Sequence, residues 1–363
     1  MPFNDLREYI ACLEKEGEVQ RIDNEVQPVF EVGAVICRSY DLRAPAPFFL
    51  NLRGYPENRI FGAPISLSRR KDWSFSRFAT SMDMPPQSTA LEIIEQYLRR
   101  LKKPIKPTLI RDGPCKENIL KGEAVDLQIF PAPLLCRGDA GPSLGTWHAT
   151  ITKDPETGVS NPNWRLHRLV IRDKTSLREL PHPSKTMRAH NETNDRPQRK
   201  STEFAIAIGT EPVTPWVAAT RLPSSVSTPD SDIIGGIRGA PLELVQCETV
   251  DLAVPATSEI VLEGLIPPRK RGEEPIYHVT AITYRNNPIL PVTYIRTPVD
   301  DVAVALSLTE AANLLEEATN TGIPVTLDDS LAHLAVDNFW PQAVRDKILQ
   351  NWRAYGYREE GPG

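Results

Sequence analysis

Four polar side chains of this sequence have the types and spacing to bind charged groups. Asn163, His167 and Arg168 lie in the stretch 146–168, TWHATITKDPETGVSNPNWRLHR, which predicts a strand, a turn at DPETG and a second strand. Glu248 follows in the later segment LVQCETVDL. An amide, a guanidinium and a carboxylate can together hold a cation and an anion, which is the chemistry of phosphate and carboxylate binding. A turn with a surface ion pair explains the same spacing equally well.

The composition is that of an ordinary globular protein. The 363 residues are 40% hydrophobic and 25% charged, with a formal net charge of -5. A chain of this length can bury a sizeable core in about two or three domains. The slightly acidic balance gives no reason to expect nucleic-acid binding. We therefore expect small molecules or proteins as partners.

The cysteines and the hydrophobic pattern predict where the protein works. Five cysteines without a close CxxC pair argue against a disulfide framework and a zinc site, and favour a reducing compartment. The N-terminal sequence is charged and amphipathic, and no apolar run approaches the roughly 18 residues that cross a bilayer. We therefore expect a cytoplasmic protein without a membrane partner. The cysteines are Cys12, Cys37, Cys115, Cys136 and Cys247.

The N-terminal part, residues 1–110, alternates between helical and strand patterns and predicts an α/β domain. Apolar residues at a helical period, with basic residues in the last turn, indicate a strong helix in ALEIIEQYLRRLKK. The prolines that follow it place a domain boundary near residue 110. The expected helices are 6–17, 29–39 and 90–103, and the expected strands are 17–23 and 48–54.

Residues 111–298 change to short β-branched runs between turns, and they predict a β-barrel or sandwich. A basic, polar insert at 188–200 is expected to be an exposed loop. Residues 299–363 begin with an amphipathic helix in DDVAVALSLTEAANLLEEATNTGI and end with another in PQAVRDKILQNWRAYGY. The strands expected in the middle part are WHATITK, FAIAIG, WVAAT, EIVLEG, YHVTAITY and ILPVTYI.

Five segments in order along the chain resemble the UbiD-type decarboxylases, particularly their fungal ferulic acid decarboxylase branch. The resemblance implies an α+β fold: an N-terminal α/β domain, a flavin-reductase-like split β-barrel that binds prenylated FMN, and a short helical C-terminal remnant. It also implies non-oxidative decarboxylation of an aromatic or α,β-unsaturated acid. The segments are DLREYIACLEKEGEVQRID, ITKDPETGVSNPNWRLHR, GGIRGAPLELVQCETVDLAVPATSEIVLEG, ITYRNNPILPV and PQAVRDKILQNWRAYGY.

The same resemblance assigns roles to the polar residues. Asn163 and Glu248 match ligands of a divalent cation, manganese or magnesium, that grips the cofactor phosphate; a potassium ion can accompany it. The third ligand should be a histidine, and the alignment admits His182 or, by strict spacing, Lys185. We prefer His182 because an ammonium group cannot ligate a cation. His190 is a poorer candidate.

Arg168 matches the arginine that orients the substrate carboxylate. The resemblance places it, with Asn163 and Glu248, among the residues that contact the cofactor. The further expected contacts come from the same segment and are Trp164, Leu166 and His167.

The acid/base part of the family site is harder to find in this sequence. The family carries an EGPFGE-like segment with two catalytic glutamates, whereas this chain reads EGLIPPRKRGEEPIY. Glu273 and Glu274 are the candidates for the catalytic carboxylates, although a solvated charge cluster explains both equally well. A long segment before the terminal helix, which in the family includes a cofactor-binding lysine and oligomer contacts, also has no counterpart here.

The sequence is compatible with three functions. The first is a prenylated-FMN decarboxylase of detoxification or secondary metabolism, supplied by a flavin prenyltransferase and forming a homodimer or larger homo-oligomer. The second is a catalytically degenerate member that binds flavin, or a full-length partner, without turnover. A flavin oxidoreductase ranks last because the sequence contains no GxGxxG fingerprint.

Overall fold

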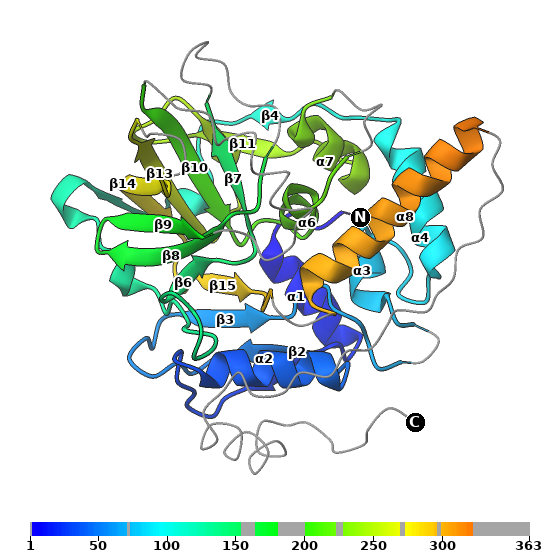
Figure 1. Cartoon of the computed structure of the whole chain (residues 1–363), viewed down its shortest axis with the longest axis horizontal. Helices are drawn as coiled ribbons and strands as arrows, with labels where there is room; N and C mark the ends of the chain where they lie inside the picture. Colours follow the sequence, from blue (N-terminus) through cyan, green and yellow to red (C-terminus); the bar gives the residue numbers. More distant parts are fainter. Residues whose placement is uncertain are drawn as a thin grey trace.

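A computed structural model of the chain describes residues 2–70, 73–153, 164–180, 200–222, 228–268, 273–295 and 299–321. Helices and sheets mix throughout this part, and the α+β prediction is confirmed (Figure 1). The predicted turn at DPETG, almost all of the loop at 188–200 and the terminal helix lie outside the described residues.

The first sheet contains four strands in the order β1-β2-β3-β15. Its β1–β2 and β3–β15 pairs are parallel, and β2–β3 is antiparallel. Strand β15 belongs to the predicted domain 111–298, whereas the other three strands belong to the predicted domain 1–110. This sheet therefore joins the two predicted domains. The domain boundaries themselves stay a prediction. The strands are β1 (Val19–Ile22), β2 (Ala46–Phe49), β3 (Arg59–Gly62) and β15 (Ile289–Val292).

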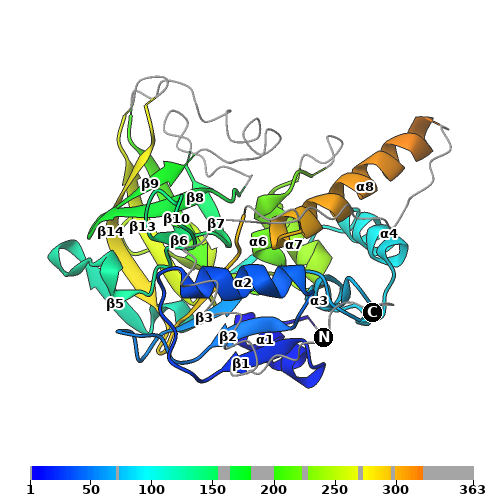
Figure 2. The same cartoon turned by 60° about the horizontal axis from the view of Figure 1, so that its bottom comes forward.

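Two helices predicted from the sequence pack near this sheet: α1 (Leu6–Lys15) and α2 (Glu31–Asp41). Helix α1 begins where the carboxylate of Asp5 accepts the backbone N–H of Glu8 at 2.8 Å. Its apolar face is buried, as the helical period predicts. Figure 2 shows α2 crossing in front of the region between this sheet and the barrel.

The second sheet contains eight strands and curves into a barrel-like layer (Figure 1). Seven follow the order β6-β8-β9-β14-β13-β10-β7, and β5 pairs with β14. Apolar side chains from its central strands fill the interior. The strands are β5 (Asn118–Lys121), β6 (Ser143–Gly145), β7 (His148–Thr152), β8 (Arg168–Asp173), β9 (Ser176–Leu180), β10 (Thr202–Ile208), β13 (Ile260–Ile266) and β14 (Ile276–Tyr284).

A smaller sheet, in the order β12-β11-β4, lies beside the barrel. It consists of β4 (Thr108–Leu109), β11 (Glu243–Gln246) and β12 (Ala253–Pro255), and short 3-10 turns connect the strands nearby. These turns are Pro114–Lys116, Gly122–Ala124 and Leu127–Ile129.

The remaining helices gather at one end of the molecule. Helix α4 begins with a capping box in which Thr89 and Glu92 exchange hydrogen bonds. The long helix α8 lies beside it in both views (Figures 1 and 2). In the part of the chain described by the structure, no helix is long and apolar enough to cross a membrane. The helices are α3 (Ser76–Ser81), α4 (Ala90–Leu101), α6 (Val213–Ala219), α7 (Asp230–Arg238) and α8 (Asp301–Thr321).

The prediction of a strand at WVAAT is wrong, because its first four residues belong to helix α6 and Thr220 is the C-cap of that helix. The buried carboxylate of Glu211 accepts the backbone N–H groups of Val213 and Thr214 at 2.8 and 2.9 Å, which caps the start of the helix. Pro215 lies in the first turn, where a helix needs no N–H donor. The β-branched and aromatic residues are buried by packing rather than by strand pairing.

Candidate functional site

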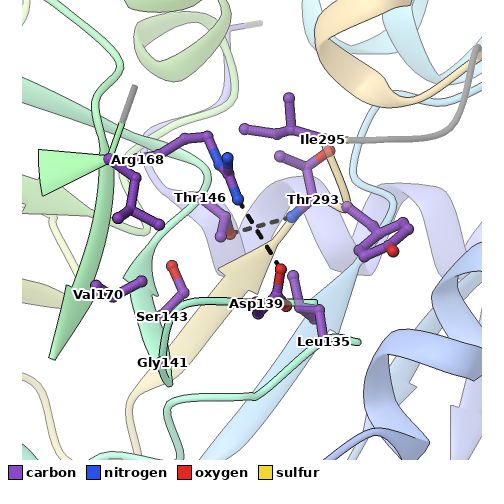
Figure 3. A pocket seen from close by; sticks show the side chains of 11 residues that line it. Leu135, Asp139, Gly141, Ser143, Thr146, Arg168, Val170, Thr293 and Ile295 are labelled. Carbon is purple, nitrogen blue, oxygen red and sulfur yellow. Dashed lines mark hydrogen bonds and ion pairs between the residues drawn. The ribbon is translucent and has the colours of Figure 1, made fainter. Parts of the chain in front are cut away.

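Arg168 lines a pocket where the barrel meets the first sheet (Figure 3). The pocket encloses about 380 Å³ of empty space, including solvent at its mouth. Strands β6 and β8, the end of β9, the loop before β6 and the segment after β15 form its walls. Residues far apart in the sequence therefore form one cavity. The residues that line the pocket include Leu135, Asp139, Ser143, Thr146, Val170 and Thr293.

Strand pairing positions Arg168. It is the first residue of β8 and lies opposite Leu180 of β9. Its side chain is 16% exposed, and its Nη2 lies 4.0 Å from Oδ1 of Asp139 across the pocket (Figure 3). A mostly buried guanidinium of this kind presents several donors in one plane, which suits a carboxylate or phosphate. The predicted anion-binding residue thus lies in a cavity.

His167 points to the opposite side of the strand. Its side chain is 1% exposed, and its Nδ1 lies 2.8 Å from Oε1 of Glu179. The hydroxyl of Tyr277 donates to Oε2 of the same carboxylate at 2.8 Å. Because successive side chains of a strand alternate between its faces, His167 and Arg168 cannot share one pocket wall. The structure therefore does not bring these two predicted site residues together.

Trp164 and Leu166 are buried in the segment that leads into β8. The backbone N–H of Leu166 donates to the carbonyl of Ala218 in α6 at 2.9 Å. Between them, Arg165 exchanges two backbone hydrogen bonds with Thr150 of β7. These contacts fix the segment between the barrel and α6. The predicted cofactor contacts of Trp164 and Leu166 stay predictions.

Asp230, which the sequence analysis missed, lies beside the predicted metal-binding segment. Its Oδ2 accepts the backbone N–H of Trp164 at 2.6 Å, and a guanidinium nitrogen of Arg165 lies 3.8 Å from the same oxygen. Burial raises the pKa of the Asp230 carboxyl to about 7. Trp164 directly follows Asn163 in the sequence. The sequence TPDSD before a glycine-containing helix was the available signal, because it marks an acidic helix start.

Glu248 has different partners. Its carboxylate oxygens lie 2.6 Å from Nζ of Lys116 and 2.5 Å from Nζ of Lys121. Hydrogen bonds from Lys116 and then Lys121 hold the pKa of the Glu248 carboxyl below its usual value. The backbone N–H of Glu248 donates to the buried carboxylate of Glu263. Two ammonium groups already balance this carboxylate, and its role as a metal ligand stays a prediction.

Glu273 and Glu274, the candidates for acid/base catalysis, are exposed and do not line the Arg168 pocket. Glu274 lies 3.4 Å from Arg178 of β9, and its side chain is 52% exposed. An exposed pair of this kind contributes little to stability and leaves both groups solvated. The catalytic role of both residues stays a prediction.

The other predicted metal ligands cannot be placed. Asn163 and His182, with the alternatives Lys185 and His190, lie outside the described residues. Within the described ranges, no group of three or more His, Cys, Asp or Glu side chains has the geometry of a metal site.

Two family models match the chain. The 3-octaprenyl-4-hydroxybenzoate carboxy-lyase N-terminal domain (UbiD_N) matches residues 10–97, and the Rift-related domain of the same enzyme (UbiD) matches residues 108–298. Together they cover the three sheets described above.

Curated relatives are named as decarboxylases. Pyrrole-2-carboxylic acid decarboxylase of Pseudomonas aeruginosa is 32% identical over 342 residues, covering 89% of this chain and 68% of the relative. Ferulic acid decarboxylase 1 of Saccharomyces cerevisiae is 30% identical over 348 residues, with the same two coverages of 89% and 68%.

Solved structures agree with this result. An evolved dimeric form of the UbiD-class enzyme HmfF from Pelotomaculum thermopropionicum, in complex with prFMN, has a TM-score of 0.70 at 28% identity and covers 88% of this chain and 73% of that one. The open form of vanillic acid decarboxylase from Sedimentibacter hydroxybenzoicus has a TM-score of 0.74 at 23% identity, with coverages of 88% and 70%, and shows the fold alone. The resemblance seen in the sequence is confirmed: the chain belongs to the UbiD family of carboxy-lyases.

Proposed function

We propose that this chain is a prenylated-FMN-dependent decarboxylase of an aromatic or α,β-unsaturated carboxylic acid. The observation that carries the proposal is the Arg168 guanidinium, which lines a pocket together with apolar side chains such as Leu135 and Val170. The names of the curated relatives and the prFMN bound to HmfF support the same reaction class. The curated relatives are named after different acids, so their names do not identify one substrate for this chain.

The pocket residues have separate tasks in this proposal. Arg168 binds the substrate carboxylate and orients the bond that breaks. Leu135 and Val170 contact the apolar part of the acid and exclude water. When bound, the prenylated flavin supplies the sink for the electron pair left by departing carbon dioxide. A proton then takes the place of carbon dioxide on the same carbon.

The residues around Trp164 fit the phosphate end of such a cofactor. Asp230 offers a buried oxygen for a hard divalent cation, and Arg165 places a guanidinium beside it for a phosphate. We propose manganese or magnesium here, held by Asp230 together with Asn163 and His182, with a potassium ion as a further candidate. Glu248 is the alternative carboxylate ligand.

A second function has its own support. Glu273 and Glu274 are exposed and do not line the pocket, and a site that these two predicted acid/base residues do not reach would bind flavin without turnover. The alternative is therefore a catalytically degenerate family member that binds flavin or a full-length partner. We also propose a flavin prenyltransferase as cofactor supplier, a homodimer or larger assembly, and a cytoplasmic setting.

Co-expression with a flavin prenyltransferase separates these functions. The purified protein's visible spectrum would report cofactor binding, and carbon dioxide release from sorbic, cinnamic and hydroxybenzoic acids would report turnover. Bound cofactor with turnover of one acid supports the decarboxylase. Bound cofactor without turnover of any of them favours the degenerate member. Failure to bind the cofactor contradicts the decarboxylase and a flavin-binding degenerate member, and leaves only a member that binds a full-length partner.

Arg168→Ala should abolish turnover and leave the flavin spectrum unchanged, because it removes the carboxylate clamp and leaves the residues around Trp164 in place. We expect a loss of about 100-fold or more in kcat/KM. The matched control is Arg178→Ala, which removes an arginine from the neighbouring strand outside the pocket lining. Undiminished kcat/KM in Arg168→Ala would contradict the clamp.

A further inference from the structure

Asp139 brings a carboxylate into the same pocket as Arg168 (Figure 3). Its side chain is 9% exposed, and Oδ1 lies 4.0 Å from the Arg168 guanidinium. The pocket therefore offers a hydrogen-bond acceptor beside the cation that binds the substrate carboxylate in the proposed function. None of the residues assigned from the sequence supplies such a group.

The loop around Asp139 is held in place by several backbone contacts. Its Oδ2 accepts the backbone N–H of Cys136 at 2.9 Å, and its own N–H donates to the carbonyl of Cys136 at 3.1 Å. Just before this turn, the carbonyl of Leu134 accepts the N–H of Phe30 at 2.7 Å. An acceptor fixed in this way loses little conformational entropy when a ligand binds, which favours selective recognition.

The hydroxyl groups of Ser143, Thr146 and Thr293 in the wall have partners within the protein, and Oγ1 of Thr293 lies 3.1 Å from the hydroxyl of Tyr40. The hydroxyl of Ser143 donates to the carbonyl of Leu169 at 2.8 Å. The hydroxyl oxygen of Thr146 accepts the N–H of Thr293 at 3.3 Å. Leu135 and Val170 are apolar. Asp139 and Arg168 are thus the charged side chains among the residues that line the pocket.

The charged pair would favour one of two kinds of acid. A hydrocarbon acid bound to Arg168 would place an apolar ring against the Asp139 carboxylate, and burying a charged group against an apolar ring is unfavourable. An acid with an N–H or O–H group next to its carboxylate can donate to Asp139 while Arg168 binds the carboxylate. A hydrogen bond to a charged acceptor contributes about 1.5–3 kcal/mol, or about tenfold to 100-fold in affinity.

We propose that Asp139 is a specificity-determining residue that selects acids carrying a hydrogen-bond donor beside the carboxylate. The inference rests on the proposed function in one respect, that Arg168 binds the substrate carboxylate. It narrows the substrate class from aromatic or unsaturated acids in general to those with an adjacent ring N–H, amino or hydroxyl group.

Two acids of matched shape test the proposal by binding alone. 2-Aminobenzoate carries an N–H donor beside its carboxylate, and 2-methylbenzoate replaces it with a methyl group. Ligand-detected NMR titration of the purified chain should show at least about tenfold tighter binding of 2-aminobenzoate. Asp139→Asn and Asp139→Ala should reduce this ratio to near one. Asp173→Asn, which alters another turn-capping carboxylate away from the pocket, should keep it.

The possible results separate this inference from the proposed function. If both acids bind equally and their binding is lost in Arg168→Ala, the selectivity of Asp139 is refuted and the clamp stands. If neither acid binds, or Arg168→Ala binds both as the parent does, the clamp is refuted and this inference with it. The comparison in the parent protein needs no substitution, so it decides the matter even if the Asp139 variants do not fold.

Discussion

Two carboxylates, Asp230 and Glu248, are candidates for the same role as metal ligand and differ in what surrounds them. Asp230 is buried beside the segment that follows Asn163, with one guanidinium nearby at 3.8 Å. Glu248 is held by two lysine ammonium groups. A cation approaching Glu248 would meet like charges, whereas a cation near Asp230 would meet a carboxylate of low solvation. The surroundings thus favour Asp230.

Asp230→Asn should lower the bound manganese and flavin of the purified protein by about tenfold or more, because it removes an anionic ligand. Glu248→Gln is the matched variant, and it should keep both. Metal analysis and the visible spectrum of the two proteins, purified after co-expression with a flavin prenyltransferase, measure the outcome. Loss of metal in Glu248→Gln with normal metal in Asp230→Asn would reverse the assignment.

Arg168 could be found from the sequence because its neighbours in the chain carry the pattern. Asp139 could not, because it reaches the site through pairing between distant segments, and for Asp230 the sequence TPDSD marks a helix start but not the segment that this helix contacts. Asp139 arrives on the loop before β6, and Asp230 at the start of α7. The alternation of His167 and Arg168 was predictable in principle once a strand was expected, but which face would line a pocket depends on the packing of the first sheet.

At the scale of elements, helix α7 positions Asp230 by packing closely against the backbone of Ile105. The Cα of Gly235 faces the carbonyl oxygen of Ile105, and a side chain on Gly235 would clash with that oxygen. The backbone N–H of Ile105 donates to the carbonyl of Asp232 at 2.9 Å. A glycine is therefore required by the close approach, although glycine disfavours a helix interior.

Gly235→Ala should destabilise the protein by about 1–3 kcal/mol, because the helix must move away from the Ile105 carbonyl. The displacement should also lower flavin content, since Asp230 lies on the same helix. Gly239→Asn is the control: Gly239 ends α7 with a φ of +79° in open space, a conformation that asparagine tolerates. Urea denaturation measures both, and an unchanged free energy of unfolding in Gly235→Ala would contradict the close packing.

Helices and strands with a clear period were predicted correctly, as α1, α4, α8 and β14 show. Helix α6 was not, because Trp216 and Val217 have strand propensity and the capping carboxylate of Glu211 lies outside the apolar run. The sequence Glu211-Pro212, which lies just before the apolar run, is the pattern that indicates the start of this helix. Local propensity therefore failed where a cap and tertiary packing decided the conformation.

At the scale of the whole molecule, one hydrogen-bonded chain joins α8, α2 and the pocket. Oδ2 of Asp301, at the start of α8, accepts the hydroxyl of Tyr40 at 2.6 Å, and Oδ1 accepts the backbone N–H of Ile65 at 2.8 Å. The Tyr40 hydroxyl also lies 3.1 Å from Oγ1 of Thr293, whose N–H donates to Thr146 in the pocket wall. The start of α8 thus contacts both sheets through buried polar groups.

The buried carboxyl group of Asp300, next to Asp301, should make the free energy of unfolding depend on pH. Burial raises the pKa of its carboxyl to about 8, from an ordinary value of 3.8. Between these values the unfolded chain releases a proton that the folded protein keeps, so the free energy of unfolding falls as pH rises. This group contributes a slope of up to about 1.4 kcal/mol per pH unit.

Asp300→Asn should remove this slope and stabilise the protein near pH 8, because an amide keeps an acceptor for the N–H of Ala303 but does not ionise. Urea denaturation at pH 6, 7 and 8 measures the difference from the parent. Asp126→Asn is the control with the opposite sign: the N–H of Gln128 and then Lys174 hold the pKa of the Asp126 carboxyl low, so its loss should not stabilise at pH 8. A constant difference across the three pH values in Asp300→Asn would contradict the assignment.

The chain of hydrogen bonds from Asp301 through Tyr40 to Thr293 also limits how this pocket can evolve. Replacing Thr293 to admit a different acid would disturb a contact on which the seating of α8 depends, so a change of substrate there would be selected against through misfolding. Val170, Leu180 and Ile295 line the same pocket without a part in that chain. Divergence in substrate preference among related proteins should therefore concentrate at these apolar positions and at Asp139, while Tyr40, Thr293 and Asp301 change together or not at all.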